Sequence, residues 1–219
     1  MKNYLAVLEN CSLFDGISRE DIPGMLDCLS AVVKKFSKNQ QILAEGDDAV
    51  FVGVMLSGSA HIVKQDFYGN RSIVARIEPA ELFGESFACA GVPELPVSVI
   101  ANEDSEIMLI PCQRITVGCS NARAFHSRMI FNLLRAVATR NLEFHQKLEI
   151  TTKRTTREKL MAYLLAQAKA KGSDTFTIPY DRQGLADYLG VERSAMSAEL
   201  GKLRKDGIID CRRSHFTLL

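Results

Sequence analysis

Small polar and basic side chains gather on one face of a helix that the C-terminal part of the sequence predicts. The helix is expected from about Glu192 to Asp206, where apolar residues recur every three or four positions. Arg193, Ser194 and Ser197 stand off that apolar stripe. An arginine can donate hydrogen bonds to guanine or pair with a phosphate, and small neighbours let a helix lie deep in the major groove of DNA. The pattern predicts a helix that reads DNA.

A shorter helix and a turn must position this one. Residues 182–189 fit a helix capped by Asp181, and Gly190 allows the positive φ of a tight turn. Two helices joined by such a turn are typical of a helix-turn-helix, whose second helix enters the major groove. A helical hairpin that makes no DNA contact is the alternative.

After Gly207 the sequence predicts a two-stranded wing with two arginines at its tip, able to meet phosphates. Residues 151–219 hold 13 Lys and Arg against 8 Asp and Glu, whereas residues 1–150 hold 14 against 18. A basic C-terminal segment suits a nucleic-acid partner. The residues expected to contact double-stranded DNA are Gln183, Arg193, Ser194, Ser197, Ala198, Lys202, Arg212 and Arg213.

Upstream, residues 32–111 contain many short, partly alternating apolar runs separated by glycine-containing turns. Such spacing is typical of an antiparallel barrel or roll. The expected fold class is therefore α+β, with an N-terminal antiparallel β-roll, a long helix and a C-terminal winged helix-turn-helix. The expected domains are an effector-sensing domain over 1–120, a dimerisation helix over 121–150 and a DNA-binding domain over 151–219.

The long helix carries a narrow stripe in alternating steps of four and three residues, which suits pairing with an identical helix. Packing of one amphipathic helix on its own domain is the other interpretation. A polar residue within the stripe can fix the register of a pair. The stripe is formed by Ile130, Leu134, Val137, Asn141, Phe144 and Leu148.

Several classes of protein are disfavoured. No apolar run is long enough to span a membrane, and the N-terminal apolar run is too short for a secretory signal, so a cytoplasmic location is expected. The six cysteines show no C-x-x-C pair, which argues against a disulfide framework or a zinc site. No catalytic or metal-binding residues are predicted. A cupin-like metal enzyme would need clustered ligands, and the predicted strands offer only His61.

The segment from Arg182 to Ser197 resembles the helix-turn-helix signature of the CRP/FNR transcription regulators. The similarity covers nearly the whole chain. Leu13-Phe14-Asp15-Gly16-Ile17 is similar to the family's opening, and Gly46, Gly58 and Gly69 stand where the turns of its β-roll occur. Leu82-Phe83-Gly84-Glu85 resembles the start of the phosphate-binding cassette in its cyclic-nucleotide branch.

The resemblance implies a homodimer in which an effector in the β-roll reorients two DNA-binding domains. Their helices would enter successive major grooves of a near-palindromic operator. It also implies that Arg193 reads a base, and that RNA polymerase is a partner if the protein is an activator. Ala198 stands where the best-known members have a second arginine, so a different operator is expected.

Departures from the family's pattern concern the effector. The positions of the cassette arginine and of the hydroxyl residue after it fall on Leu95 and Pro96, and no Thr-Ser pair occurs near Arg140–Phe144. Burying a phosphate without a cation is costly, so cyclic AMP is not expected to be the effector. The expected pocket, suited to an apolar or weakly polar ligand, is lined by Gly84, Glu85, Ser86, Phe87, Leu95, Pro96, Val97, Asn141 and Phe144.

The cofactor stays open at this stage. An iron–sulfur cluster of the FNR type is disfavoured because Cys11 and Cys28 stand far apart. Haem is conceivable through one of three histidines, which are His61, His126 and His145. A regulator without any effector, or one controlled by oxidation of Cys112 and Cys119, is a further alternative.

Overall fold

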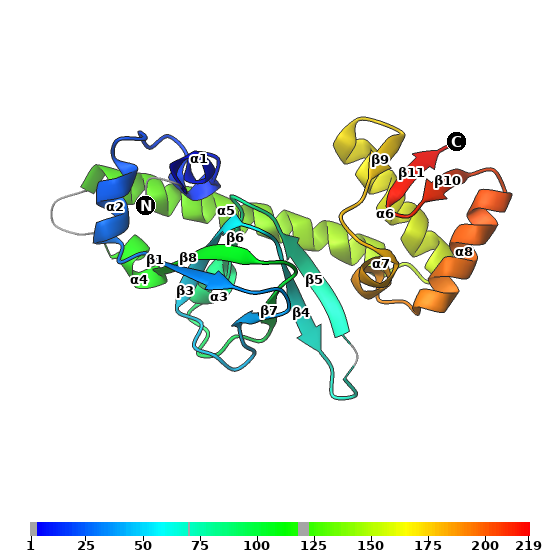
Figure 1. Cartoon of the computed structure of the whole chain (residues 1–219), viewed down its shortest axis with the longest axis horizontal. Helices are drawn as coiled ribbons and strands as arrows, with labels where there is room; N and C mark the ends of the chain where they lie inside the picture. Colours follow the sequence, from blue (N-terminus) through cyan, green and yellow to red (C-terminus); the bar gives the residue numbers. More distant parts are fainter. Residues whose placement is uncertain (1–3, 70, 118–122) are drawn as a thin grey trace. The chain divides into compact units, whose positions relative to one another are not determined.

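The computed structural model describes residues 4–69, 71–117 and 123–219. The chain forms two compact units, one of residues 1–70 with 74–141 and one of residues 71–73 with 142–219. The long helix α5 (Arg123–Thr151) begins in the first unit and ends in the second (Figure 1). The division into residues 1–120, 121–150 and 151–219 stays a prediction.

Two four-stranded antiparallel sheets form the β-roll of the first unit. Their strand orders are β1-β8-β3-β6 and β2-β7-β4-β5. Glycine-containing turns punctuate the strands as the sequence predicts. The bounds are β1 (Val32–Phe36), β2 (Gln41–Leu43), β3 (Phe51–Ser57), β4 (Ala60–Gln65), β5 (Arg71–Ile77), β6 (Leu82–Phe83), β7 (Ser98–Ala101) and β8 (Ser105–Pro111).

Residues 52–56 of β3 and residues 107–110 of β8 are apolar, and all of them are buried. Val54 of β3 packs with the N-terminal helices, whereas its neighbour Met55 packs into the core between the sheets. Successive side chains of a strand point to opposite faces, so β3 contributes side chains to two hydrophobic cores. The helices of this unit before α5 are α1 (Leu5–Leu8), the 3-10 helix η2 (Ser12–Phe14), α2 (Ile22–Cys28), α3 (Glu85–Ala90) and α4 (Cys112–Thr116).

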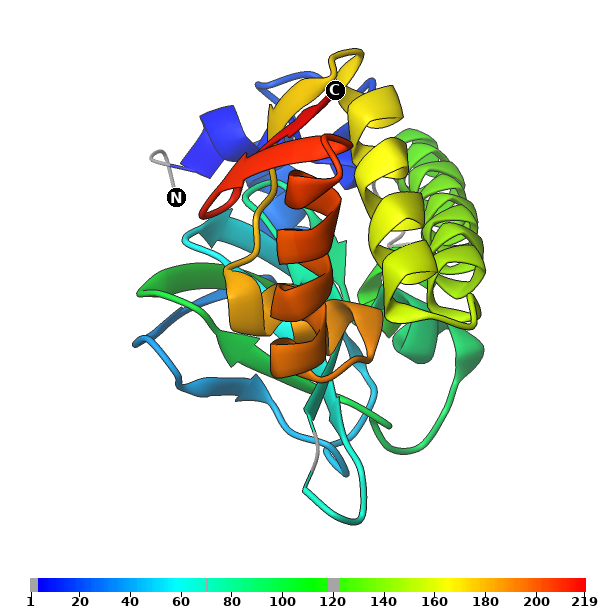
Figure 2. The same ribbon diagram turned by 90° about the vertical axis from the view of Figure 1, so that its right-hand side faces the viewer.

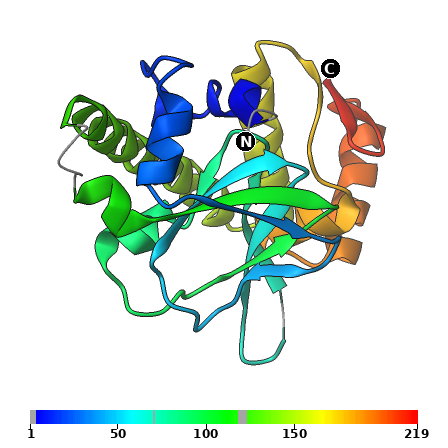
Figure 3. The same cartoon turned by 60° about the vertical axis from the view of Figure 1, so that its left-hand side comes forward.

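The first half of α5 is joined to the N-terminal segment, and Figure 3 shows α2 beside its first turns. The buried side-chain amide of Asn132 donates to the carbonyl oxygens of Leu13 and Asp15, both at 2.9 Å. Arg135 forms an ion pair with the Asp15 carboxylate. These contacts hold the first half of α5 against the N-terminal segment.

The second unit contains a three-stranded antiparallel sheet in the order β10-β11-β9 and the helices that pack on it (Figure 2). The winged helix-turn-helix predicted from the sequence is present. Its elements are α6 (Thr156–Lys171), β9 (Thr175–Thr177), α7 (Arg182–Leu189), α8 (Arg193–Lys205), β10 (Ile209–Arg212) and β11 (His215–Leu218).

Local signals set the helix ends of this unit. Thr155 and Glu158 form a reciprocal capping box at the start of α6, and Gly172 ends that helix with a φ of 61°. Within the described ranges, the structure contains no helix with the length and apolarity that a bilayer crossing requires.

Candidate nucleic-acid interface

The turn between α7 and α8 is fixed by hydrogen bonds at both ends of α7. The Asp181 carboxylate accepts from the backbone N–H of Gly184 at 2.7 Å, which caps the helix as the sequence predicts. Gly190 follows α7 with a φ of 62°, and the N–H of Val191 donates to the carbonyl of Ala186 at 3.1 Å. The orientation of α8 therefore depends on a glycine that tolerates this backbone conformation.

A lysine of α6 also stabilises the turn between α7 and α8. The Lys159 ammonium donates to the carbonyl oxygens of Leu189 and Gly190, at 3.3 and 3.4 Å. A cation at the C-terminal end of a helix satisfies unpaired carbonyl groups and interacts favourably with the helix dipole. Helix α6 thus holds the position at which α8 begins.

Helix α8 buries one face and exposes the other. Met196, Leu200 and Leu203 pack into the core of the unit and are 0–3% exposed. Every residue that the sequence predicts to contact DNA is exposed in the chain: Gln183, Arg193, Ser194, Ser197, Ala198, Lys202, Arg212 and Arg213. The N-terminal face of α8 is thus open to a partner, as major-groove contact requires.

A groove of about 540 Å³ brings three of these residues together from three elements. Gln183 of α7, Arg193 of α8 and Arg213 of the wing all line it. Arg213 occupies the tight turn between β10 and β11 with a φ of 54°, and Arg212 ends β10. The wing tip is therefore basic and adjoins the start of α8.

The side chain of Arg182, the first residue of α7, packs against the wing. Its guanidinium lies 5.4 Å from the ring centroid of Phe216, and it donates to the sulfur of Cys211 at 3.5 Å. Cation–π contact of this kind suits a half-buried arginine. Sequence reasoning did not single out this residue, because its role depends on the packing of two distant segments.

Two of the eight residues already donate hydrogen bonds within their own helix. The Gln183 amide donates to Asp187 at 2.7 Å, and the Lys202 ammonium pairs with Glu199 at 2.5 Å. Both pairs lie at the surface, where such contacts are weak and readily exchanged for others.

The stripe on α5 is largely exposed within one chain. Leu134 is 66% exposed, Leu148 58%, Ile130 42% and Phe144 39%. Asn141 is exposed as well, and Val137 is half-buried. Large apolar side chains left in water along one helix indicate a surface that another molecule covers.

The cassette of the β-roll contains an ion pair that the sequence did not reveal. Glu85, which begins α3, is only 2% exposed, and its carboxylate accepts from Nε of Arg140 on α5 at 3.4 Å. The same guanidinium donates to the carbonyl of Leu82 at 2.8 Å. Gly84 has a φ of 76°, and a Cβ there would meet the Phe51 carbonyl at 2.9 Å. Glycine is therefore required at the corner that presents Glu85.

The remaining expected effector residues divide between the core and the surface. Leu95, Val97 and Phe87 pack in the core between the sheets, and Ser86 is half-buried. The carbonyl of Pro96 accepts from the Lys64 ammonium at 2.8 Å, and Lys64 also pairs with the Glu45 carboxylate. Two cations that contact residues of this region, Lys64 and Arg140, each have a carboxylate partner, which a phosphate would have to displace.

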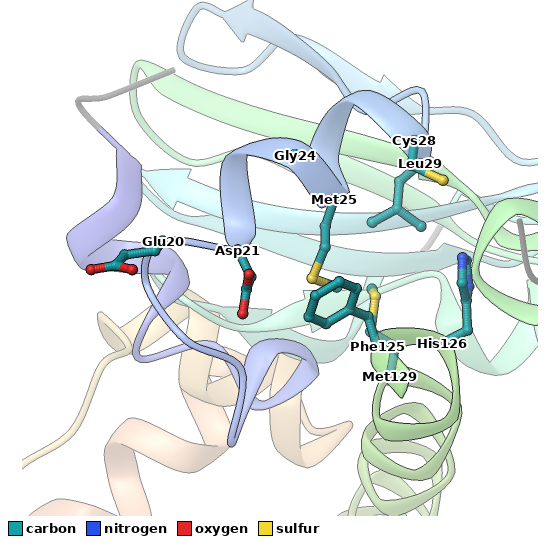
Figure 4. A pocket seen from close by; sticks show the side chains of 9 residues that line it. All are labelled: Glu20, Asp21, Gly24, Met25, Cys28, Leu29, Phe125, His126 and Met129. Carbon is teal, nitrogen blue, oxygen red and sulfur yellow. The ribbon is translucent and has the colours of Figure 1, made fainter. Parts of the chain in front are cut away.

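A cavity of about 200 Å³ lies between α2 and the start of α5, away from the expected pocket (Figure 4). Met25, Leu29, Phe125 and Met129 form its apolar wall. His126 also lines it, with Nδ1 at 3.4 Å from the carbonyl oxygen of Ile115. No sequence signal marks this cavity, because its walls come from segments about a hundred residues apart.

The candidate cofactor ligands are dispersed. His61 lies on β4, and His145 is exposed on α5. Burial raises the pKa of the Cys11 thiol to about 12, as expected for a small buried side chain. Among the residues that the structure describes, no three His, Cys, Asp or Glu side chains lie together as a metal site would require. Cys119 lies outside the described residues.

Comparisons with known proteins agree with this architecture. Residues 158–219 match the model of a Crp-like helix-turn-helix domain, and residues 33–117 match that of a cyclic nucleotide-binding domain. A probable transcriptional activator of Rhizobium leguminosarum bv. viciae is 26% identical over an alignment of 186 residues, which covers 80% of this chain and 72% of that protein. The transcriptional activator FnrL of Cereibacter sphaeroides is 24% identical over 193 residues, with 80% and 71% covered.

Among solved structures, the chain is similar to the c-di-GMP-responsive global regulator CLP of Xanthomonas campestris. The TM-score is 0.73 at 17% identity, with 90% of this chain and 98% of that chain covered. At this identity the likeness concerns the fold alone.

Proposed function

Since this chain belongs to the CRP/FNR family of transcription regulators, we propose that it binds a specific DNA operator as a homodimer. Its relatives are transcription regulators, and the chain itself is a regulator and not an enzyme. We further propose that it works in the cytoplasm, where a bacterial chromosome lies. Since two relatives are named transcriptional activators, RNA polymerase is a proposed partner.

The observation that supports DNA binding most directly is the exposed N-terminal face of α8 beside the basic wing tip. Arg193 and Arg213 line one groove, so a single duplex could meet both. Base contacts from α8 would supply sequence preference, and the wing arginines would supply affinity for phosphate. The small side chains of Ser194 and Ser197 leave room for close approach to the base edges.

Dimerisation through α5 is supported by the exposed stripe. Pairing two copies would remove four large apolar side chains of each copy from water: Ile130, Leu134, Phe144 and Leu148. Each such side chain contributes about 1.5–3 kcal/mol when it is fully buried. Asn141 lies within the stripe, where a polar residue specifies register at some cost in stability.

We propose that cyclic AMP is not the effector, because the cassette does not offer its phosphate an unpaired cation. Leu95 is buried in the apolar core at the position where the family resemblance implies an arginine. Lys64 and Arg140 are engaged by Glu45 and Glu85, so neither offers an unpaired charge to a phosphate. Titration calorimetry with cyclic AMP should therefore give no binding heat, and saturable binding would refute this proposal.

Selection from a random duplex library tests the function and identifies the operator in the same experiment. We expect full-length protein to enrich one near-palindromic sequence, because each protomer presents the same α8 face. Arg193→Ala should enrich that sequence less strongly and with a relaxed base preference at one position of each half-site. Lys171→Ala is the matched control, because it removes one exposed positive charge at the far end of α6 and should enrich the wild-type sequence. Equal recovery of all sequences by wild-type protein would contradict the proposal.

A further inference from the structure

Two cysteines of the first unit face each other across neighbouring helices. The sulfur of Cys89, on α3, lies 3.9 Å from the sulfur of Cys112, at the start of α4. Cys89 is exposed, whereas Cys112 is 7% exposed. A disulfide bond is about 2.05 Å long, so the two sulfur atoms need to approach by about 2 Å. Cys89 belongs to a short helix, α3, which ends at Ala90 and is capped by Gly91.

We propose that Cys89 and Cys112 form a dithiol site that a hydroperoxide converts to a disulfide. The sulfur of Cys89, the more exposed of the two residues, attacks the hydroperoxide: the O–O bond breaks, an S–O bond forms, and the alcohol or water leaves. Cys112 then attacks the resulting sulfenic acid, the S–S bond forms and a water molecule leaves. In total, two thiols and one hydroperoxide give one disulfide, one alcohol or water, and one water.

The position of the pair connects it to the cassette. Cys89 follows Glu85 by four residues on α3, so the two side chains lie on the same face of the helix. Glu85 carries the buried carboxylate that pairs with Arg140 of α5. A disulfide that draws α3 toward α4 therefore strains the contact between Glu85 and the long helix. Any effect on DNA affinity rests on the proposed function.

The resting state of the site at neutral pH is the dithiol. Partial burial, together with Cys112 and Glu85, raises the pKa of Cys89 to about 12. Because the thiolate is the nucleophile, the rate of attack by Cys89 should rise about tenfold per pH unit between pH 7 and pH 9. A site of this kind responds to sustained or strong oxidation and not to trace oxidant.

Hydrogen peroxide is the probe for the full-length protein. After treatment at pH 8.5, the number of thiols titrated in denaturant should fall from six to four, and peptide mapping should find Cys89 joined to Cys112. After the same treatment, the Cys89→Ser and Cys112→Ser variants should each still titrate five thiols. Cys211→Ser, which changes a half-buried cysteine on β10, is the control and should form the bond normally.

Three other products would overturn the proposed dithiol site. They are sulfenic acids that do not go on to a disulfide, sulfinic acids, and disulfides with other cysteines. Affinity for the selected operator, measured separately on reduced and oxidised protein, keeps the two proposals apart. If the disulfide forms and neither state binds DNA, the proposed function fails and the dithiol site stands. If reduced protein binds DNA and no disulfide forms, the dithiol site fails and the proposed function stands.

Discussion

Arg193 is the residue on which base recognition is expected to depend most. It is exposed in the first turn of α8 and borders the groove that Gln183 and Arg213 also line. Arg193→Ala should cost about 1–3 kcal/mol at the selected operator and relax the base preference at one position of each half-site. Competition binding with single-base variants of the operator measures both effects. An unchanged base preference would show that Arg193 does not read a base.

Arg212 ends β10 beside the wing tip and is expected to contact phosphate only. Arg212→Ala should weaken binding to operator and random duplex alike, and should lower the slope of log affinity against log salt by about one. Fluorescence anisotropy between low and physiological salt gives that slope. Loss confined to the operator would instead assign Arg212 a role in sequence recognition.

At the scale of elements, the exposed stripe of α5 predicts a specific failure of assembly. Leu134→Glu places a charge within the stripe and should convert the dimer to a monomer, because an unpaired carboxylate is costly to bury. Since Leu134 is already 66% exposed, the fold of each chain should survive, as circular dichroism can show.

The matched control for that change is Thr139→Glu, on the exposed outer face of the same helix. In a heptad this position lies opposite the stripe, so the dimer should persist. Sedimentation velocity distinguishes the 24.3 kDa monomer from the dimer in both variants. Dissociation of both variants, or of neither, would argue against pairing through this stripe.

Helix α5 also carries a lysine whose burial makes stability depend on pH. Burial lowers the pKa of Lys147 from its ordinary value near 10.5 to about 8, and its ammonium lies 4.2 Å from the ring centroid of Tyr188. The unfolded chain therefore binds a proton more tightly than the folded chain does. The buried ammonium therefore lowers the free energy of unfolding. This loss of stability is fully present below pH 8 and is relieved as pH rises from about 8 toward 10.5.

Comparison of wild type with Lys147→Met isolates this effect, because the cysteines and tyrosines that also titrate are common to both. Between pH 7 and pH 9 wild type should gain stability as Lys147 loses its proton, and the variant should not. The free energy of unfolding of the variant minus that of wild type should therefore fall by about 1 kcal/mol. Urea denaturation at the two pH values measures it. Lys153→Met, at an exposed site, should show no such change.

At the scale of the whole molecule, the sequence predicted what local patterns encode. Glycine turns marked the strands of the β-roll, and Asp181 and Gly190 marked the helix-turn-helix, because caps and positive-φ turns need particular residues nearby. The eight residues predicted to contact DNA, six on the two helices and two on the wing, are all exposed, although their contacts with DNA stay a prediction.

What the sequence did not predict depends on segments that only the fold brings together. Glu85 and Arg140 are separated by 55 positions, and Cys89 and Cys112 by 23. The cavity beside His126 joins α2 to the start of α5. Neither periodicity nor spacing carries information about such pairs, since each residue alone is consistent with an ordinary core or surface position.

A hydroxyl-radical footprint of the full-length protein on its selected operator tests the central claim most directly. Two copies of α8 presented outward should protect two patches, centred in successive major grooves about 10–10.5 base pairs apart. The pattern should be symmetric about the centre of the operator. A single protected patch, or protection that does not depend on the sequence, would contradict a dimeric regulator that reads DNA through α8.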